Sequence, residues 1–299
     1  MAATELQLVN SLINDAALKA YYRFSTGALT TDSSGEAHTL TAISDPAEDA
    51  SGKFGGAVAL DGDDAYSATD HADFKPTGPF TVGVWVKASD VTAGPVLFQS
   101  YSKNTNRAGI TLSIGTNGYV SLLQGCNNGT TAGTHYQSVT GDVGVADGNW
   151  HFVVGVWDGS YIRVYIDGTE DANTAFANAP AYAATNYVRV GCYNAAGTNS
   201  NFLTGSLDDV FLINGTALSA DQIESIYDGT INSVSPSASP SVSPSTSISP
   251  SLSRSISPSI SLSISKSVSP STSISPSLSR SISPSISKSI SPSISLSIS

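Results

Sequence analysis

The chain has 299 residues, with 13 basic and 24 acidic side chains and a formal net charge of −11. All of the acidic residues lie in residues 1–232, whereas residues 233–299 carry four basic side chains and no acidic one. An acidic globular part repels phosphate, which argues against nucleic acid as a partner. About 230 residues are enough to bury a substantial core in one domain, above all in an all-β one.

The N-terminal segment starts with a capping box, in which Thr4 is the N-cap and Gln7 reaches back to it. Apolar residues then recur at helical spacing as far as Ile13, and residues 1–19 are predicted to hold a short N-terminal helix. No basic region followed by an apolar stretch precedes it, so no signal peptide is expected. The chain has no run of 18 apolar residues, so no membrane span is expected either.

After this segment the hydrophobic period changes from 3.6 to 2, which is the period of half-buried strands. Turn dipeptides such as Asn117-Gly118 and Asp167-Gly168 separate the stretches with this pattern. Short strands at this spacing predict an all-β sandwich. The predicted strands are Phe80–Ser89, Gly109–Gly115, Tyr119–Gly125, Trp150–Trp157, Tyr161–Ile166, Tyr187–Gly191 and Asp208–Ile213.

One of these strands, Trp150–Trp157, is apolar on both faces. Phe152 and Val154 share one face, while Val153 and Trp157 share the other. One face packs in the core between the sheets, and we expect the N-terminal helix to cover the other.

A second helix is predicted near the end of the acidic part. Ser219 is a good N-cap, Gln222 lies at the third helical position, and Gly229 follows the last turn. This pattern predicts a short C-terminal helix that closes the domain.

Six motifs follow one another in the order found in a known family. The chain resembles the laminin-G-like, concanavalin A-type lectin and glucanase jelly rolls over roughly 70% of its length, from Ala20 to Gly229. The motifs are AYYRF (20–24), DSSGEAH (32–38), GKFGGAVALDGDDAY (52–66), FTVGVWVK (80–87), GNWHFVVGVWDGSYIRVYIDG (148–168) and GSLDDVFLINGTALSADQIESIY (205–227).

The resemblance implies an antiparallel two-sheet jelly roll over residues 20–232, with a closing helix. Members of the family commonly bind glycans or proteins through rim loops, often beside a calcium ion. A glycan or another cell-surface ligand is therefore the expected partner.

The glutamates argue against an enzyme of the glucanase type. A retaining glycosidase needs two carboxylates about 5 Å apart, which on a strand requires acidic residues two or four positions apart. The five glutamates show no such spacing, Glu170 is placed in a turn, and Glu224 lies on the closing helix. His151, inside a predicted strand, is interpreted as structural. The chain is predicted not to be an enzyme.

A calcium site is the predicted cofactor site. Asp208 is placed on the same face as Val210 and Leu212, and a carboxylate among core residues is costly unless it is paired or bound to metal. The family carries calcium near the loop that here contains Asp32. Asp32 and Asp208 are therefore the candidate ligands, with the absence of metal left as the alternative.

The acidic turn with Asp61, Asp63 and Asp64 is a second candidate for metal binding. The competing interpretation is a solvated turn, since Asp and Gly are the residues that turns favour.

A sugar site needs an exposed aromatic ring with amide and carboxylate groups around it. Three Asn-rich loops provide such groups, and Tyr101, Tyr136 and Tyr193 beside them are the candidate ligand-binding residues. The competing interpretation is that these are ordinary surface loops.

The two cysteines, Cys126 and Cys192, are too few for a disulfide framework. One bridge between them is an open alternative, and two buried free thiols are the favoured one.

From Ser233 to Ser299 every odd-numbered residue is serine, and aliphatic residues or proline fill most of the even positions. The 21 residues 241–261 recur unchanged as 267–287, which indicates growth by duplication. The segment is predicted to be an extended stalk, disordered or O-glycosylated. The alternative is a fibre in which all serines lie on one face of a β-like chain, which the prolines oppose.

Together these features predict a non-catalytic adhesion or carbohydrate-binding head on a low-complexity stalk, located outside the cell or on a virion surface such as a phage tail. A homo-oligomer is expected. The alternative is a structural filament subunit whose sandwich binds no ligand.

Overall fold

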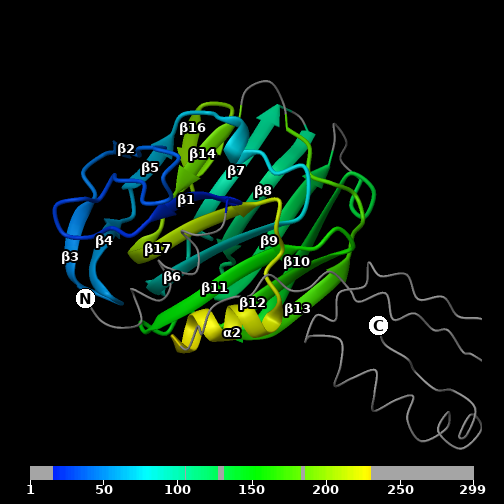
Figure 1. Ribbon diagram of the computed structural model, residues 1–299. Helices are drawn as coiled ribbons and strands as arrows, with labels where there is room; N and C mark the ends of the chain where they lie inside the picture. Colours follow the sequence, from blue (N-terminus) through cyan, green and yellow to red (C-terminus); the bar gives the residue numbers. More distant parts are fainter. Residues whose placement is uncertain (1–15, 105, 127–130, 183–185, 230–299) are drawn as a thin grey trace, which may run out of the picture. The chain divides into compact units, whose positions relative to one another are not determined.

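The computed structural model describes residues 16–104, 106–126, 131–182 and 186–229; the side chains of residues 102–107 also fall outside this description. Two large antiparallel sheets of eight and seven strands pack face to face, and a small two-stranded hairpin accompanies them (Figure 1). The predicted fold class, an antiparallel two-sheet sandwich, is confirmed. The predicted helix in residues 1–15 and the stalk from Ser233 lie outside the described residues, and so does the predicted domain boundary between residues 232 and 233.

The eight-stranded sheet has the order β13-β12-β11-β6-β17-β4-β3, and β1 pairs with β17 as well. Its strands are β13 (Thr169–Ala175), β12 (Tyr161–Ile166), β11 (Trp150–Trp157), β6 (Phe80–Asp90), β17 (Thr204–Asn214), β4 (Gly55–Asp61), β3 (Ala47–Gly52) and β1 (Leu18–Tyr22).

The seven-stranded sheet has the order β10-β9-β8-β7-β14-β5-β2. Its strands are β10 (Tyr136–Gly144), β9 (Tyr119–Cys126), β8 (Asn106–Ile114), β7 (Val96–Asn104), β14 (Tyr187–Val190), β5 (Ala65–Ala68) and β2 (Thr41–Ile43). The remaining elements are the hairpin β15 (Tyr193–Ala195) and β16 (Thr198–Ser200), the 3₁₀ helix η1 (Ala72–Phe74) and the helix α2 (Ala220–Asp228).

Strands with a clear two-residue period were predicted well. β11 and β12 have the predicted bounds, and every other predicted strand overlaps an observed one. The remaining strands lack that signal: β3, for example, reads Ala-Glu-Asp-Ala-Ser-Gly and contains no buried residue. It forms through its pairing with β4 rather than through its own residue preferences. Leu18 and Lys19, which close the segment 1–19 assigned to the N-terminal helix, lie in β1.

The core lies between the two sheets. In β11, Val153 and Trp157 belong to it, and the neighbouring β9 and β8 contribute Leu122 and Leu112 from the opposite sheet. Each fully buried side chain of this size stabilises the fold by about 1.5–3 kcal/mol. This core requires both sheets at once, so neither sheet is stable alone.

The outer face of the eight-stranded sheet holds a second apolar cluster. Phe152 and Val154 of β11 lie there with Trp85 of β6, and the cluster includes Ile223 and Ile226 of α2. Among the described residues, the C-terminal helix α2 therefore covers this face, which we predicted for the N-terminal helix. Figure 1 shows α2 beside β12 and β13.

The caps of α2 match the sequence pattern. Ser219 accepts a hydrogen bond from the backbone N–H of Gln222, and the Gln222 side chain accepts one from the Ser219 backbone N–H. Gly229 ends the helix with a φ of 64°, a left-handed conformation in which glycine has no steric penalty. None of the helices in the described ranges combines the length and the apolar character that crossing a membrane requires.

Candidate functional site

The outer face of the seven-stranded sheet is polar over β8, β9 and β10. In antiparallel sheets, directly paired residues project to the same side. One such set runs Ser138–Leu123–Thr111–Gln99–Arg189 across β10, β9, β8, β7 and β14. The alternate residues of these strands project into the core, which leaves this set on the outer side.

A second set of paired residues carries most of the aromatic rings of this face. It runs Tyr136–Gly125–Gly109–Tyr101–Tyr187 across the same five strands. Three strand spacings separate Tyr136 from Tyr101, a distance of about 14 Å between their backbones. The two positions between them are glycines, so no side chain stands between the two tyrosines in this row.

Gly109 is required by the backbone at its position. Its φ of 103° lies in the region that favours glycine, and a Cβ there would come within 2.2 Å of the Ser100 carbonyl oxygen. The glycine in this row is thus a consequence of the close approach of β8 to β7.

Towards β10, short hydroxyl side chains form the outer surface. Ser138 and Thr140 are exposed, and Ser121 is half-buried. The Thr140 hydroxyl donates to the Ser121 hydroxyl at 3.2 Å, and Ser121 donates to the Val139 carbonyl at 3.1 Å. We call the outward residues Ser113, Ser121, Leu123, Tyr136, Ser138 and Thr140 the polar face.

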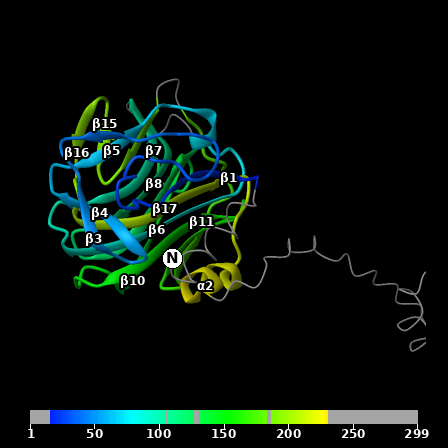
Figure 2. The ribbon, with the colours of Figure 1, turned by 60° about the vertical axis from the view of Figure 1, so that its left-hand side comes forward.

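The β15–β16 hairpin packs beside the polar face, next to β7 and β14 (Figures 1 and 2). The buried Gln99 side chain fixes it, because its Nε2 donates to the Asn194 carbonyl at 2.8 Å and its Oε1 accepts from the Asn194 N–H at 2.7 Å. Arg189 Nε donates to Asn199 Oδ1 at 3.2 Å. These contacts hold the hairpin in one position and present Tyr193 at one side of the face.

The structure brings the three predicted tyrosines to the same side of the sheet. Tyr101 is 3% exposed and packs against Tyr193 with ring centroids 5.9 Å apart. Its ring therefore supports Tyr193 rather than offering a platform itself. Tyr136 and Tyr193 are half-buried.

Sequence reasoning missed Tyr187, Arg189 and Gln99 on this face. The alternation in Tyr187–Val190 already placed Tyr187 and Arg189 on the side opposite the core residues Val188 and Val190. The pairing that places them beside Tyr101 and Gln99 is not visible in the sequence.

Asp32, the first predicted calcium ligand, organises its own loop. One carboxylate oxygen accepts from the backbone N–H groups of Tyr21 and Ser34, at 3.0 and 2.9 Å. The other accepts from the Ser34 hydroxyl at 2.9 Å and from the His38 N–H at 2.8 Å. These four donors fix the path of residues 32–38.

Asp208, the second predicted ligand, does not lie on the face that we predicted. A β-bulge between Asp208 and Phe211 shifts the alternation, and Asp209 adopts a φ of 48°. Val210 and Leu212 consequently face the core, whereas Asp208 pairs with Trp85, whose side chain belongs to the outer cluster.

Asp208 and Asp209 form a buried pair of adjacent carboxyl groups. Burial raises the pKa of both, and for Asp208 the neighbouring charge of Asp209 raises the pKa further. Asp208 accepts from the Phe54 N–H at 3.1 Å, and Asp209 accepts from the Tyr21 hydroxyl at 2.6 Å. The pair is therefore biased towards holding a proton.

The acidic turn gains a residue that the sequence did not indicate. Asp45 joins Asp63 and Asp64, with one carboxylate oxygen of each lying within 4.8 Å of the others. The Asp64 carboxylate accepts from the N–H groups of Asp45 and Asp61 at 2.9 and 3.3 Å. The charge of Asp61 is the main cause of a raised pKa for Asp63.

Calcium at Asp32 and Asp208 stays a prediction. The contacts above give each of the two carboxylates backbone donors of its own, and neither belongs to a group of three candidate ligands among the described residues. A thermal melt of the full chain with Ca²⁺ and with chelator checks it, because an ion that binds only the native state raises Tm.

Two of the acidic and basic groups considered for catalysis have structural partners. Glu170 lies in β13 rather than in a turn, where it accepts from Asn173 at 2.7 Å and from the Tyr165 hydroxyl at 3.2 Å. His151 contacts Asp167 at 2.8 Å and Asp147 at 3.0 Å through its two ring nitrogens. Burial lowers the pKa of His151, but these two carboxylates outweigh it and raise that pKa.

Both cysteines are free: Cys192 is buried and Cys126 is half-buried. The Cys126 thiol donates to the backbone carbonyls of Thr134 and His135 at 3.2 Å. The favoured alternative is confirmed in that both thiols are free, but only Cys192 is buried as that alternative predicted.

The two face-to-face antiparallel sheets define a β-sandwich. A laminin G family model, described as the concanavalin A-like lectin/glucanases superfamily, matches residues 61–224, and the chain belongs to this family. The resemblance predicted from the six motifs is confirmed. No curated protein sequence shows a significant match.

Solved structures share the fold at low identity. The binding domain of Paraclostridial mosquitocidal protein 1 matches 75% of this chain and 53% of its own, with a TM-score of 0.58 and 12% identity. Domain 4 of AbnA, a GH43 extracellular arabinanase from Geobacillus stearothermophilus, in complex with arabinotriose, matches 70% of this chain and 98% of its own, with a TM-score of 0.54 and 21% identity.

A third similar structure is the ligand-binding domain of botulinum neurotoxin serotype D in complex with N-acetylneuraminic acid. It matches 75% of this chain, with a TM-score of 0.55 and 17% identity. The chain spans about half the length of this toxin structure and of the mosquitocidal one.

Proposed function

We propose that this protein is a non-catalytic carbohydrate-binding protein whose ligand lies on the polar face of the seven-stranded sheet. The observation that carries the proposal is that two kinds of side chain lie on one side of this sheet. These are the hydroxyl side chains of β9 and β10 and the half-buried Tyr136 and Tyr193. Hydroxyl groups exchange hydrogen bonds with sugar hydroxyls, and aromatic rings pack on the apolar faces of sugar rings.

The similar structures support a glycan as the ligand class. Arabinotriose is bound by the arabinanase domain, and N-acetylneuraminic acid by the neurotoxin domain of serotype D. Another similar domain belongs to botulinum neurotoxin type C, whose cell entry depends on two ganglioside molecules. Both a polysaccharide and a cell-surface glycan are thus compatible with this fold.

The second part of the proposal concerns the arrangement of the chain. A binding head that ends near residue 232 and a stalk over residues 233–299 suit adhesion outside the cell or on a virion surface. Fully extended, 67 residues reach about 200 Å. Several heads in one oligomer raise the apparent affinity for a surface that carries many glycans.

The stalk and filament alternatives differ in their dependence on the serine period. One residue inserted after Ile260 moves every later serine to the other face of an extended chain. A spacer tolerates this change, and we expect unchanged solubility and hydrodynamic radius. Filaments that form with the native chain and disappear with the insertion would identify the chain as a filament subunit instead.

A glycan array with the full chain tests the binding function. We expect a small set of related glycans to bind, with dissociation constants in the micromolar to millimolar range that is ordinary for one shallow site. A released product would show an enzyme, and an array without any bound glycan would contradict the proposal.

A further inference from the structure

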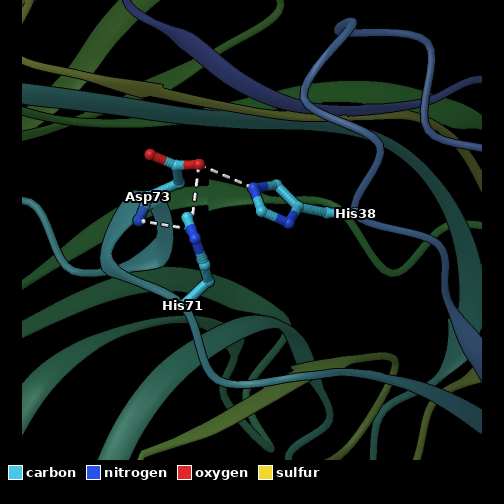
Figure 3. Close-up of side chains that lie close together, drawn as sticks. All are labelled: His38, His71 and Asp73. Atoms are coloured by element: carbon cyan, nitrogen blue, oxygen red, sulfur yellow. Dashed lines mark hydrogen bonds and ion pairs between the residues drawn. The ribbon is translucent and has the colours of Figure 1, made fainter.

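His38, His71 and Asp73 meet at one place although the first two are 33 positions apart in the sequence. His38 ends the loop that Asp32 organises, while His71 and Asp73 lie at the start of η1 (Figure 3). Asp73 Oδ2 lies 2.7 Å from His38 Nε2 and 2.9 Å from His71 Nδ1. All three atoms lie within 4.8 Å of one another.

A cation resolves a conflict in this cluster. His71 Nδ1 accepts a hydrogen bond from the Asp73 backbone N–H at 3.3 Å, so in that arrangement it presents a lone pair and no proton. The same nitrogen lies 2.9 Å from the Asp73 carboxylate oxygen, where two lone pairs repel each other. A positive ion bound to both atoms takes up the lone pair of His71 Nδ1 in place of the 3.3 Å hydrogen bond, and it replaces the repulsion by two bonds to the metal.

The surrounding residues hold His38 in place. Its backbone N–H donates to Asp32 at 2.8 Å, and its carbonyl accepts from the Tyr22 hydroxyl at 2.8 Å. Its ring packs on Phe74 with centroids 4.8 Å apart. A ligand fixed by such contacts loses little freedom when a metal binds.

Asp73 is fixed in a similar way. Its backbone carbonyl accepts from the Asn214 side chain at 3.0 Å, which ties η1 to the end of β17. The next carbonyl, that of Phe74, accepts a hydrogen bond from the buried Ser100 hydroxyl. The cluster thus joins β17, β7, η1 and the 32–38 loop.

The donor set selects a class of metal. Two imidazole nitrogens and one carboxylate oxygen suit Zn²⁺ and related first-row ions, whereas Ca²⁺ takes six to eight oxygens. Bonds of about 2.0–2.1 Å in a tetrahedral arrangement separate the ligand atoms by about 3.3 Å. The two separations measured from Asp73 Oδ2, 2.7 and 2.9 Å, reach this value when the side chains open by about half an ångström.

We propose that His38, His71 and Asp73 bind a divalent transition-metal ion of the Zn²⁺ type, separate from the polar face. Three protein ligands leave a fourth position for water or for an oxygen atom of a bound molecule. The His71 side chain is 54% exposed, so this position is open to solvent. The ion joins the 32–38 loop to η1.

His151 provides a matched control. It also has two carboxylate neighbours, but they contact opposite nitrogens of its ring. Those two nitrogens project in different directions, so the three groups cannot converge on one ion.

Zn²⁺ titration of the chelator-treated full chain by calorimetry tests the proposal, and Co²⁺ absorption reports the coordination. We expect one Zn²⁺ per chain and Co²⁺ bands of a four- or five-coordinate site. His71→Ala, at the most exposed ligand, should weaken Zn²⁺ binding by about 100-fold or more. His151→Gln and Cys126→Ser, which removes the half-buried thiol, should bind as the native chain does.

Asp73→Asn is a second variant that keeps the side-chain shape, and it should lose Zn²⁺ affinity while its Tm without metal stays close to that of the native chain. Either of two results would overturn the proposal: no Zn²⁺ binding by the native chain at 100 µM or below, or equal Zn²⁺ affinity in the native chain and the His71→Ala variant. Equal competition by Ca²⁺ would also contradict it, because the donor set disfavours that ion.

Discussion

The outer faces of the two sheets differ in chemistry although the sheets share one core. On the eight-stranded sheet, Trp85, Phe152 and Phe211 form an apolar surface that α2 covers. On the seven-stranded sheet, the polar face carries hydroxyl groups and the half-buried Tyr136, and Tyr193 lies beside it on the β15–β16 hairpin. The buried residues of α2 belong to the apolar cluster of the other sheet.

The difference indicates how the fold divides stability from recognition. A sheet face that is covered by a helix stabilises the fold and is unavailable to a ligand. A polar face costs little to expose and can exchange hydrogen bonds with a sugar. Substitutions on the two faces should therefore affect different measurements.

The largest effect is expected at Trp85. Its ring stacks on Phe152 and Tyr227, with centroids 5.1 and 5.7 Å away, and it is 1% exposed. Trp85→Ala should lower the free energy of unfolding by about 3–5 kcal/mol, because it leaves a cavity under α2. Denaturant unfolding of the full chain measures this change.

Two further variants keep that test informative. If Trp85→Ala does not fold, Ile223→Ala on α2 should cost about 2–5 kcal/mol by the same mechanism. Ser138→Ala on the polar face should change the free energy of unfolding by less than about 0.5 kcal/mol. Equal losses in the free energy of unfolding for variants on the two faces would contradict the claim that only the covered face stabilises the fold.

The second effect concerns binding. Tyr136→Ala should weaken glycan binding by about tenfold or more, since it removes aromatic surface from the polar face. The same substitution at Tyr161, a 41% exposed tyrosine on β12 of the other sheet, is the matched control and should leave affinity unchanged. Calorimetric titration with the best glycan from the array gives both values. Equal affinity in the two variants would place the ligand elsewhere.

The third effect is a dependence of stability on pH, caused by the buried Asp208 and Asp209. Because burial raises the pKa of Asp208 and Asp209, the native state holds a proton that the unfolded chain releases near pH 4. The stability linked to this proton is fully present below about pH 4 and is lost as the pH rises through the raised native pKa.

Between pH 5 and pH 9 the free energy of unfolding should change by about 1–3 kcal/mol less in Asp208→Asn than in the native chain, because the amide carries no titrating proton. Urea unfolding at several pH values measures it, and Asp142→Asn, at an exposed position on β10, is the control. A native chain whose stability rises steadily over this range would show that the pair does not titrate as described.

Local signals made much of the fold predictable from sequence. The bounds of β11 and β12 follow from their alternation, and the caps of α2 follow from Ser219, Gln222 and Gly229. The order of the family motifs predicted the two-sheet sandwich. Strands such as β3 were missed because pairing, and not their own residues, makes them extended.

The candidate sites depend on contacts between distant segments, and these could be predicted only in part. Tyr136 was identified by its loop, but its place opposite Gly125 follows from strand register. The bulge after Asp208 reversed the predicted face of that residue, because one extra residue shifts a two-residue period. The meeting of His38 with Asp73 has no local signal at all.

The central claim is that the ligand binds the polar face, and chemical-shift mapping tests it most directly. The ¹⁵N-labelled full chain is titrated with the glycan that scores highest on the array. We predict that the shifted amide signals belong to Ser121–Leu123 and Tyr136–Thr140, while those of β11 and α2 stay in place. Shifts confined to β11, β12 and α2 would contradict the account, because they would place the ligand on the covered side of the sandwich.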